Sequence, residues 1–291
     1  MRRGGAALAA ATIVTAAFAV PATAKHRPRP SGPFATAAMR SFLATRSGDI
    51  TAAVYNIRNR RLFIYRPGVA QDEASIAKVD ILATLLHEDQ LRGEPLSAGE
   101  AQLAAGAIEY SDNGDAQQLW NAAGYNEAIA AFNGEAGMTQ TVLDPAGIWG
   151  HYETTALDQI RLLEQLALPS SLLDRASRSF ELRLMRGVTA AQAWGVSAGV
   201  LSPATAALKN GWLPPSNEAG WQINSVGIVR GRFRHYLIAV LTRDNATMAY
   251  GVQTIEGISR LVWRHLLPAR FRHHHSHPAD GNLQTWNSPP A

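Results

Sequence analysis

The sequence predicts an α+β fold in which helices flank a five-stranded antiparallel sheet and an all-α lobe is inserted between two groups of strands. Two observations support this prediction. Strand-like segments occur early, in residues 49–67, and late, in residues 204–243, whereas helical periodicity fills the region between them. Neither group of strands makes a stable sheet alone, so we expect the two groups to pair with each other.

The individual elements follow from local patterns. The segment DITAAVYNIRNRRLFIYRP (49–67) is rich in β-forming residues on both sides of a polar RNR turn and predicts a hairpin. The short amphipathic stretch ATAAMRSFLATR, which precedes the hairpin, predicts a helix. Apolar residues then recur at helical spacing in residues 75–90, 97–110, 114–135, 155–168 and 170–187. Three strands, at 204–213, 220–230 and 232–243, and a last helix at 251–267 complete a domain that we place at 38–268. A site is expected at the seam between sheet and lobe.

The N-terminus predicts an export signal. Arg2 and Arg3 precede the apolar stretch AALAAATIVTAAFAV, and PATA places small residues at the cleavage positions that end at Ala24. The stretch is short and weakly apolar for a membrane span, although an N-terminal anchor is the alternative. We therefore expect a signal peptide at 1–24, a Pro-rich linker at 25–37, and a secreted protein with no membrane attachment after cleavage.

Composition limits the possible chemistry. The 291 residues are 46% hydrophobic and 17% charged, which is typical of a globular protein, and the absence of cysteine excludes disulfides, thiolate metal sites and a cysteine nucleophile. The formal net charge of +4 without a long basic block argues against a nucleic-acid partner. The His-rich tail at 269–291 lacks periodicity and predicts disorder, with adventitious metal binding as the alternative. We expect no metal, no cofactor and a monomer.

The use of basic residues is uneven. Only three of the 27 basic residues are lysines, namely Lys25, Lys78 and Lys209. A buried lysine can lose its proton and act as a base, whereas the guanidinium of arginine stays charged. In a chain that uses arginine for general positive charge, Lys78 and Lys209 are therefore candidates for a role that arginine cannot fill.

The first candidate motif is the Ser75-x-x-Lys78 pair in DEASIAKVDIL (72–82). Residues three apart share one face of a helix, so the lysine amine can serve as the base for the serine hydroxyl. At a helix N-terminus the backbone N–H of Ser75 can also point at a developing oxyanion. Taken alone, the pattern is more typical of an N-capping serine beside a surface lysine than of a catalytic pair.

Two later motifs have the same ambiguity when each is taken alone. Ser111, Asp112 and Asn113 in EYSDNGDA offer a second hydroxyl for proton relay and an amide that can orient a lysine, but they also suit a helix boundary. Lys209 in ALKNGWL interrupts an apolar strand, which indicates either a pocket-facing lysine or the protection of an edge strand. Gly211 would let a ligand backbone approach closely.

In this order the three motifs resemble the S-x-x-K, S-D-N and K-T-G motifs of the serine β-lactamases and penicillin-binding proteins, most closely those of class A β-lactamases. The resemblance covers about residues 38–268 and includes YSDNGDAQQLW and TTALDQIRLLEQL, the second being similar to the helix after the Ω-loop. It implies a β-lactamase/transpeptidase-like fold and a serine hydrolase with Ser75 as nucleophile, Lys78 and Ser111 as its catalytic partners, and Asn113, Lys209 and Gly211 as substrate-binding residues. The substrate would be a β-lactam or a cell-wall peptide.

The sequence departs from the family pattern at two places. Asn210 replaces the hydroxyl residue of K-T-G, and we expect its amide to bind the substrate carboxylate instead, while Trp212 would supply the second oxyanion N–H. The Ω-loop region TVLDPAGIWGHYETTALD lacks the E-x-x-L-N glutamate that activates the deacylating water. Asp144 and Glu153 are the only acids there before the two threonines and are the candidates for a weak deacylation acid, although Asp144 resembles the structural aspartate of the family.

These features lead to three hypotheses about function. The first is a secreted hydrolase that acylates on Ser75 and hydrolyses β-lactams, weakly because loss of a general base costs about two to four orders of magnitude in rate. The second is a D,D-carboxypeptidase or penicillin-binding-protein-like peptidase that acts on cell-wall peptides. The third is a non-catalytic binding descendant of the fold, which Asn210 and the short Ω-loop favour and the intact Ser75–Lys78 pair opposes.

Overall fold

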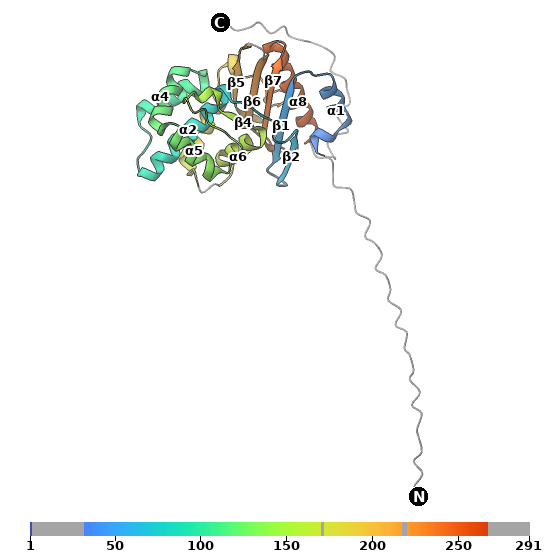
Figure 1. The fold of residues 1–291 in the computed structure, drawn as a ribbon, viewed down its shortest axis with the longest axis horizontal. Helices are drawn as coiled ribbons and strands as arrows, with labels where there is room; N and C mark the ends of the chain where they lie inside the picture. Colours follow the sequence, from blue (N-terminus) through green and yellow to red (C-terminus); the bar gives the residue numbers. More distant parts are fainter. Residues whose placement is uncertain (2–31, 170–171, 217–219, 267–291) are drawn as a thin grey trace. The chain divides into compact units, whose positions relative to one another are not determined.

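A five-stranded antiparallel sheet forms the centre of the domain (Figure 1), in the strand order β2-β1-β7-β6-β5. The strands are β1 (Asp49–Asn56), β2 (Arg61–Tyr65), β5 (Thr205–Leu213), β6 (Trp221–Arg230) and β7 (His235–Asn245). The early hairpin joins the late meander because β1 pairs with β7 along its whole length, from Asp49↔Arg243 to Asn56↔Tyr236. The predicted α+β fold and its five-stranded sheet are therefore confirmed.

This computed structural model describes Met1 and residues 32–169, 172–216 and 220–266. The predicted signal peptide at 1–24 lies outside the described residues except for Met1. The predicted tail at 269–291 and most of the predicted linker at 25–37 lie outside them as well. None of the described helices is both long enough and apolar enough to span a membrane.

The two faces of the sheet bury different sets of apolar side chains because residues alternate along a strand. On β7, Ile238 and Val240 join one apolar cluster, whereas Leu237, Ala239 and Leu241 join the other. Helices α1 (Ala37–Ala44) and α8 (Met248–His265) cover the first face, and α6 (Ala156–Ala167) packs against the second (Figure 1). The second face also points toward the helical lobe.

The helical lobe lies between β2 and β5 in the sequence and is built around α2 (Ala77–Arg92), whose residues are mostly buried. Around α2 the lobe contains α3 (Ala98–Ala105), α4 (Asn113–Ala123), α5 (Tyr125–Ala136), α6 and α7 (Arg175–Arg186). The prediction of one helix at 114–135 was wrong, because Gly124 takes a left-handed φ of 103° and separates α4 from α5. The prediction of one α-helix at 97–110 was also inaccurate, since α3 continues as a π-helical turn over Gly106–Tyr110.

A second, two-stranded sheet was not predicted. It pairs β3 (Ala70–Asp72) with β4 (Glu153–Thr155) in antiparallel register, with Asp72 opposite Glu153. Three-residue strands carry too few side chains to show an alternating pattern, so sequence periodicity could not have revealed them. This small sheet ties the segment that leads to Ser75 to the end of the loop at 142–153.

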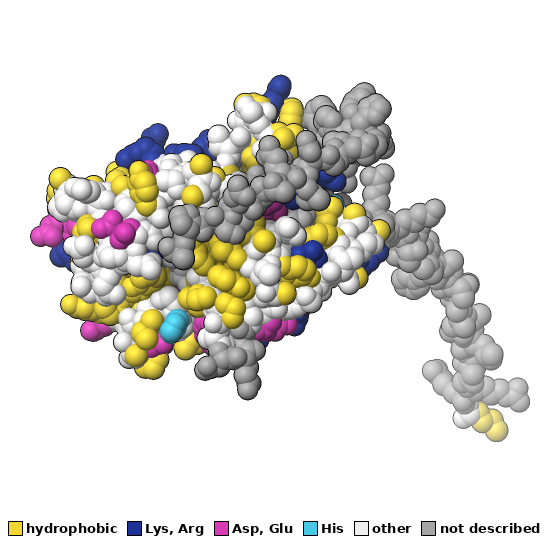
Figure 2. Space-filling view, turned by 90° about the horizontal axis from the view of Figure 1, so that it is seen from above, with side chains coloured by type: hydrophobic (Ala, Val, Ile, Leu, Met, Phe, Trp, Pro, Cys, Tyr) yellow, Lys and Arg dark blue, Asp and Glu magenta, His cyan; other side chains and the backbone are white. Residues whose placement is uncertain are grey.

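The surface also carries apolar groups. Figure 2 shows one face on which hydrophobic side chains gather in the middle of the domain and acidic side chains lie toward its edges. Several large apolar residues of the domain are well exposed, among them Tyr110 at 65%, Val142 at 62% and Ile148 at 48%. Tyr110 immediately precedes Ser111, and the other two belong to the loop at 142–153, so apolar surface borders the segments that carry the candidate site.

Candidate active site

Ser75 lies on a tight turn between β3 and α2. Ala74 takes a left-handed φ of 53°, and Ala74–Ile76 then form a short 3₁₀ helix that leads directly into α2. A left-handed non-glycine residue costs of the order of 1 kcal/mol, so the rest of the fold must hold this turn in place. The Ser75 side chain is partly exposed, and its hydroxyl makes no hydrogen bond to another described residue. The serine is thus fixed by its backbone while its hydroxyl stays available.

Lys78, in the first turn of α2, is completely buried. Its Nζ donates to the Ser111 carbonyl oxygen at 2.5 Å and to Asn113 Oδ1 at 2.7 Å, and it lies 3.2 Å from Ser111 Oγ. Burial lowers the pKa of Lys78 to about 7, although the nearby carboxylates of Asp112 and Asp115 act in the opposite direction. A substantial fraction of Lys78 is therefore neutral near neutral pH, as a general base requires.

Lys209 approaches the same hydroxyl from β5. Its Nζ lies 2.8 Å from Ser111 Oγ and 3.0 Å from the Asn210 carbonyl oxygen, and the side chain is fully buried. Burial lowers the pKa of Lys209, and the positive charge of Lys78 lowers it further. β5 is indeed an edge strand, but a buried lysine bonded to Ser111 does not protect that edge from solvent.

The S-D-N segment is both a helix boundary and part of the site. Ser111 ends the π-helical turn with a left-handed φ of 64°, and Asp112 Oδ1 caps α4 by accepting from the Asp115 N–H at 2.8 Å. The side chains on either side of this cap, Ser111 and Asn113, both contact Lys78. The two interpretations of the motif are therefore compatible, because the cap fixes the backbone that presents the two polar side chains.

Gly211 brings β5 directly against the serine turn. A β-carbon at this position would lie only 2.7 Å from the Ser75 backbone nitrogen and 2.8 Å from that of Ile76. Only glycine permits so close an approach. The Ser75 backbone N–H and the edge of β5 are consequently neighbours, which is the arrangement that an oxyanion site needs.

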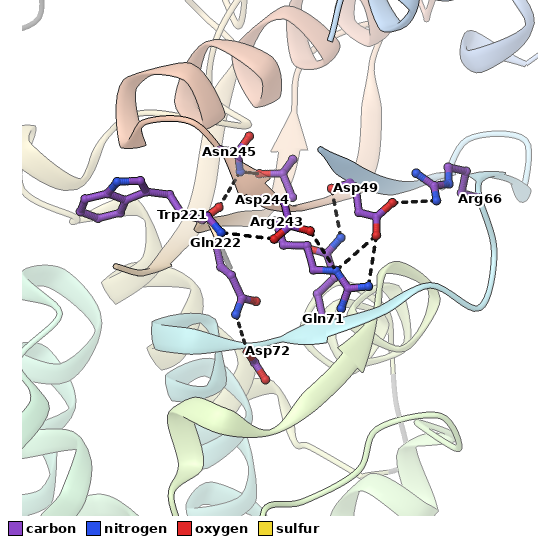
Figure 3. Close-up of polar contacts among 11 residues, drawn as sticks. Asp49, Arg66, Gln71, Asp72, Trp221, Gln222, Arg243, Asp244 and Asn245 are labelled. Atoms are coloured by element: carbon purple, nitrogen blue, oxygen red, sulfur yellow. Dashed lines mark hydrogen bonds and ion pairs between the residues drawn. The ribbon is translucent and has the colours of Figure 1, made fainter. Parts of the chain in front are cut away.

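Sequence reasoning missed Asn224, which fastens this turn from the neighbouring strand. It lies opposite Gly211 on β6, is fully buried, and its Nδ2 donates to the carbonyl oxygens of Asp72 at 2.7 Å and Glu73 at 3.1 Å. Gln222, two residues earlier on the same face of β6, donates through its amide to the Asp72 carboxylate (Figure 3). No motif marks these residues, but the alternation along β6 would have placed both of them on the face that carries the site.

The structure does not place the Asn210 amide where the sequence led us to expect it. Both amide hydrogens of Asn210 are donated to backbone carbonyls, of Gln192 at 2.8 Å and of Trp194 at 3.1 Å. Trp212 packs its ring 6.2 Å from that of Trp194 and belongs to the cluster beneath α8. Because Lys209 and Gly211 face the serine, the alternate residues Asn210 and Trp212 face away from it. Asn210 thus anchors the segment at 192–194, and no amide hydrogen is left for a substrate carboxylate.

The loop at 142–153 places the indole ring of Trp149 over Lys78. It does not place either candidate acid, Asp144 or Glu153, in that position. The Trp149 ring centroid lies 5.3 Å from Lys78 Nζ, and the Trp149 indole N–H donates to Gln117 Oε1 at 3.1 Å. Within the described part of the chain, no hydrogen bond or ion pair links Asp144 or Glu153 to Lys78 or Ser111. Asp144 instead accepts from the Ala146 N–H at 2.6 Å within its own loop, and Glu153 belongs to β4.

Four buried carboxyl groups, which sequence reasoning also missed, lie behind the site: Glu73, Asp80, Asp158 and Glu181. Burial raises the pKa of each of them, for Asp80 to about 7. Gln159 donates to Glu73 Oε1 at 3.1 Å, and Asp158 accepts from the Gln140 N–H at 2.7 Å. Burial thus favours the neutral form of these acids. Among the described residues, no three histidine or acidic side chains are arranged to hold a metal ion.

The assembled groups are those that acyl transfer requires. Ser75 offers an unengaged hydroxyl beside its own backbone N–H, Lys78 offers an amine with a lowered pKa, and Ser111 Oγ connects that amine to Lys209. An unengaged hydroxyl, an amine of lowered pKa, a second hydroxyl and a backbone N–H thus occur together, and nucleophilic catalysis uses this combination of groups.

Solved structures of known enzymes have the same fold. A β-lactamase from Chitinophaga pinensis DSM 2588 matches with a TM-score of 0.69 and 18% identity, over 77% of this chain and 96% of that chain. The TLA-3 extended-spectrum β-lactamase matches with a TM-score of 0.71 and 16% identity, over 79% and 97% of the two chains. An ancestral class A β-lactamase matches with a TM-score of 0.67 and 20% identity, over 77% and 96%. At these identities the likeness establishes the fold.

Comparison of the sequence with models of protein families identifies the family of this chain. No curated protein matches the chain. The sequence model of the Beta-lactamase enzyme family matches residues 95–266, which is more than half of the 291 residues and includes Ser111 and Lys209. The predicted resemblance is thereby confirmed: the chain belongs to the Beta-lactamase enzyme family and has the fold of class A β-lactamases.

Proposed function

We propose that this protein is a serine hydrolase that forms an acyl-enzyme on Ser75, with β-lactams as its substrates and slow release of the acyl group. The observation that carries the proposal is the position of Ser111 Oγ, 2.8 Å from Lys209 Nζ and 3.2 Å from Lys78 Nζ. A hydroxyl held between two buried amines of lowered pKa has no evident structural purpose, but it suits the transfer of a proton across the site.

The proposed acylation is balanced within these groups. The Ser75 oxygen attacks the lactam carbonyl carbon, and neutral Lys78 accepts the serine proton. The Ser75 backbone N–H stabilises the oxyanion beside Gly211. When the lactam C–N bond breaks, the proton passes from Lys78 through the Ser111 hydroxyl to the leaving nitrogen, which leaves an ester on Ser75 and a neutral amine.

Release of the acyl group is expected to be slow because Trp149 covers Lys78. Hydrolysis of the ester needs a base that activates water, and an indole ring cannot accept a proton. Asp144 and Glu153, the candidate weak acids, have no described contact with Lys78 or Ser111. This arrangement supports an acyl-enzyme that outlives the acylation step.

The same observation favours a second candidate function, a D,D-carboxypeptidase or a related peptidase that acts on cell-wall peptides. Such an enzyme acylates through the same three groups and does not require rapid hydrolysis of a bound β-lactam. The arrangement of Lys78, Ser111 and Lys209 opposes the third hypothesis, a non-catalytic descendant, because a pure binding protein has no need for two buried lysines. Export through the predicted signal at 1–24, a monomeric state and the absence of a nucleic-acid partner remain part of the proposal.

One experiment separates these functions. Protein lacking residues 1–24 is incubated with a chromogenic β-lactam while colour and intact mass are followed together. A stoichiometric adduct with slow turnover supports the proposed hydrolase, and a stable adduct without turnover supports the peptidase. Ser75→Ala should abolish the adduct, whereas Ser179→Ala, at an exposed serine of α7, should not change it. The absence of any adduct with folded wild-type protein would exclude both enzymes.

A further inference from the structure

A cavity adjoins the serine turn on the face of the sheet that carries the site. Along β5, Lys209 and Gly211 face Ser111 and Ser75, and the alternation of the strand places Leu213 on the same face. Leu213 pairs with Gln222 on β6, and both residues line a cavity of about 620 Å³. At about 3.3 Å per residue, Leu213 lies roughly 7 Å beyond Gly211 along the strand.

The other wall of this cavity comes from the two segments that the small sheet joins. Asp72 contributes from β3, three residues before Ser75, and Glu153 contributes from β4 directly opposite it. Leu143 and Asp144 contribute from the loop between α5 and β4. We call this cavity the side pocket. Its volume suits part of a small-molecule ligand.

The side pocket lies on the acyl side of the scissile bond. Ser111, the proposed proton donor to the leaving nitrogen, and Lys209 lie on one side of the contact between Gly211 and Ser75. Leu213 lies on the other side of that contact along the same strand. A substrate that places its leaving group beside Ser111 therefore directs its acyl substituent toward the side pocket.

Three carboxylates that line the side pocket favour a cation, whereas His151, which also lines it, opposes one when protonated. Asp72, Asp144 and Glu153 contribute carboxylates, and no lysine or arginine occurs among the lining residues that the structure describes. Asp144 already accepts from the Ala146 N–H and lies 3.8 Å from His151, but the Glu153 side chain has no hydrogen-bond or ion-pair partner among the described residues.

A neutral acceptor in the side pocket also lacks a donor. Gln222 donates a hydrogen bond from its Nε2 to the Asp72 carboxylate (Figure 3), and its buried Oε1 has no hydrogen-bond partner among the described residues. A buried amide oxygen without a donor is costly, and a ligand N–H would satisfy it. The acceptor and the three carboxylates thus call for a hydrogen-bond donor that carries positive charge.

We propose that the side pocket selects substrates whose acyl substituent carries a protonated amine on a short apolar stem. This inference rests on the proposed acyl-enzyme function and specifies its substrate class. The ammonium group offers three donors to Glu153, Asp72 and the Gln222 oxygen, while Leu143 and Leu213 cover the stem. A substituent that carries a carboxylate is repelled by the same residues.

The test uses three penicillins that share one ring system and differ only in the acyl substituent: phenylglycyl with an amine, phenylacetyl without charge, and phenylmalonyl with a carboxylate. The second-order rate of adduct formation on the full chain is followed by intact mass at about pH 6, where an α-amino group is protonated. We expect the amine probe to react fastest, the neutral probe more slowly and the carboxylate probe slowest. The rate should differ by about fivefold between successive probes, as for a solvent-accessible charge pair.

The variants assign this order to the side pocket. Glu153→Gln should bring the three rates closer together, and Glu153→Lys should make the carboxylate probe faster than the amine probe. Glu256→Gln removes a carboxylate from α8, on the opposite face of the sheet, and should leave the order unchanged. Melting temperatures show whether each variant is folded.

The outcomes separate this proposal from the function on which it rests. Adducts that form at equal rates with all three probes, or an order that Glu153→Lys leaves unchanged, would overturn the side pocket while the acyl-enzyme stands. No adduct with any of the three probes would overturn the acyl-enzyme and the side pocket with it.

Discussion

Lys209 Nζ and Ser111 Oγ lie 2.8 Å apart, although 98 residues separate them in the sequence. Lys78 Nζ lies 3.2 Å from the same hydroxyl. The serine oxygen can accept a hydrogen bond from both amines, and burial lowers the pKa of both. Because the positive charge of Lys78 lowers the pKa of Lys209 further, the site disfavours the state in which both lysines are charged.

Removal of the Lys209 amine should slow acylation without unfolding the protein. Lys209→Met keeps an unbranched, buried side chain and leaves Ser111 Oγ with Lys78 alone. Loss of the hydrogen bond between Lys209 and Ser111 Oγ predicts a decrease of about tenfold in the second-order acylation rate. Intact mass against time measures the rate, and near-UV circular dichroism checks the fold. A variant that acylates as fast as the wild type would show that Lys209 has no role in the reaction.

Acylation should depend on pH through Lys78. The neutral amine is the base, and the pKa of Lys78 is lowered to about 7, so the acylation rate should rise through that pH and level off above it. The measurement is the adduct-formation rate of a β-lactam whose own groups do not titrate in that range. A profile that is flat from about pH 5 to pH 9 would mean that Lys78 is not the base.

Replacement of Trp149 should change deacylation more than acylation. Trp149→Glu puts a carboxylate over Lys78, where the ring centroid now lies 5.3 Å from Nζ. A positioned base should shorten the lifetime of the acyl-enzyme by about tenfold to hundredfold. Trp149→Phe, the matched control, keeps a ring without a base and should leave the lifetime near that of the wild type. If both variants release the acyl group equally fast, access of water rather than a base limits release.

The buried acids should make the fold less stable as pH rises through the weakly acidic range. The pKa of Asp80 is raised to about 7 in the folded protein and those of Glu73 and Glu181 are also raised, whereas unfolded carboxyls titrate near pH 4. In that window the folded state binds more protons, so the free energy of unfolding falls as pH rises, by at most about 1.4 kcal/mol per pH unit for each proton.

Urea denaturation between about pH 5 and pH 7 measures this slope, to which the two buried lysines, whose pKa values are lowered, contribute with the opposite sign. Asp80→Asn keeps the shape of the side chain and removes one titrating group, so it should flatten the slope and stabilise the protein at pH 7. Glu127→Gln, at an exposed position of α5, is the control and should keep the wild-type slope. Parallel slopes for Asp80→Asn and the wild type would contradict this prediction.

Much of the site could be predicted from the sequence, because Ser75, Lys78, Ser111 and Lys209 occur in short motifs that resemble those of a known family. The sheet could be predicted because its strands are long enough to show their pattern. The orientation of Asn210 away from the site was predictable too. Once Lys209 faces the site, the alternation of side chains along a strand places Asn210 on the other face.

Other features depend on contacts between distant segments. The pairing of Asp72 with Glu153 and the position of Trp149 over Lys78 follow from how the loop at 142–153 folds back, and no local pattern specifies that. Asp80, Asp158 and Glu181 belong to helices whose apolar periodicity tolerates a polar residue, and Glu73 lies on the turn after β3. The burial of all four acids therefore becomes visible only when these segments pack. Sequence patterns thus identify the candidate catalytic residues, and packing decides their protonation and their neighbours.

The pairing of β1 with β7 has a consequence for the order of events during synthesis. The serine turn and Lys78 are made early, but Lys209 and Gly211 belong to an edge strand that is held by β6, which is in turn held by β7. A nascent chain that ends before residue 205 therefore contains Ser75 without the strand that lies against it. If Ser75 is acylated as we propose, the unfinished protein should not react with its substrate until the last third of the chain has joined the first strand.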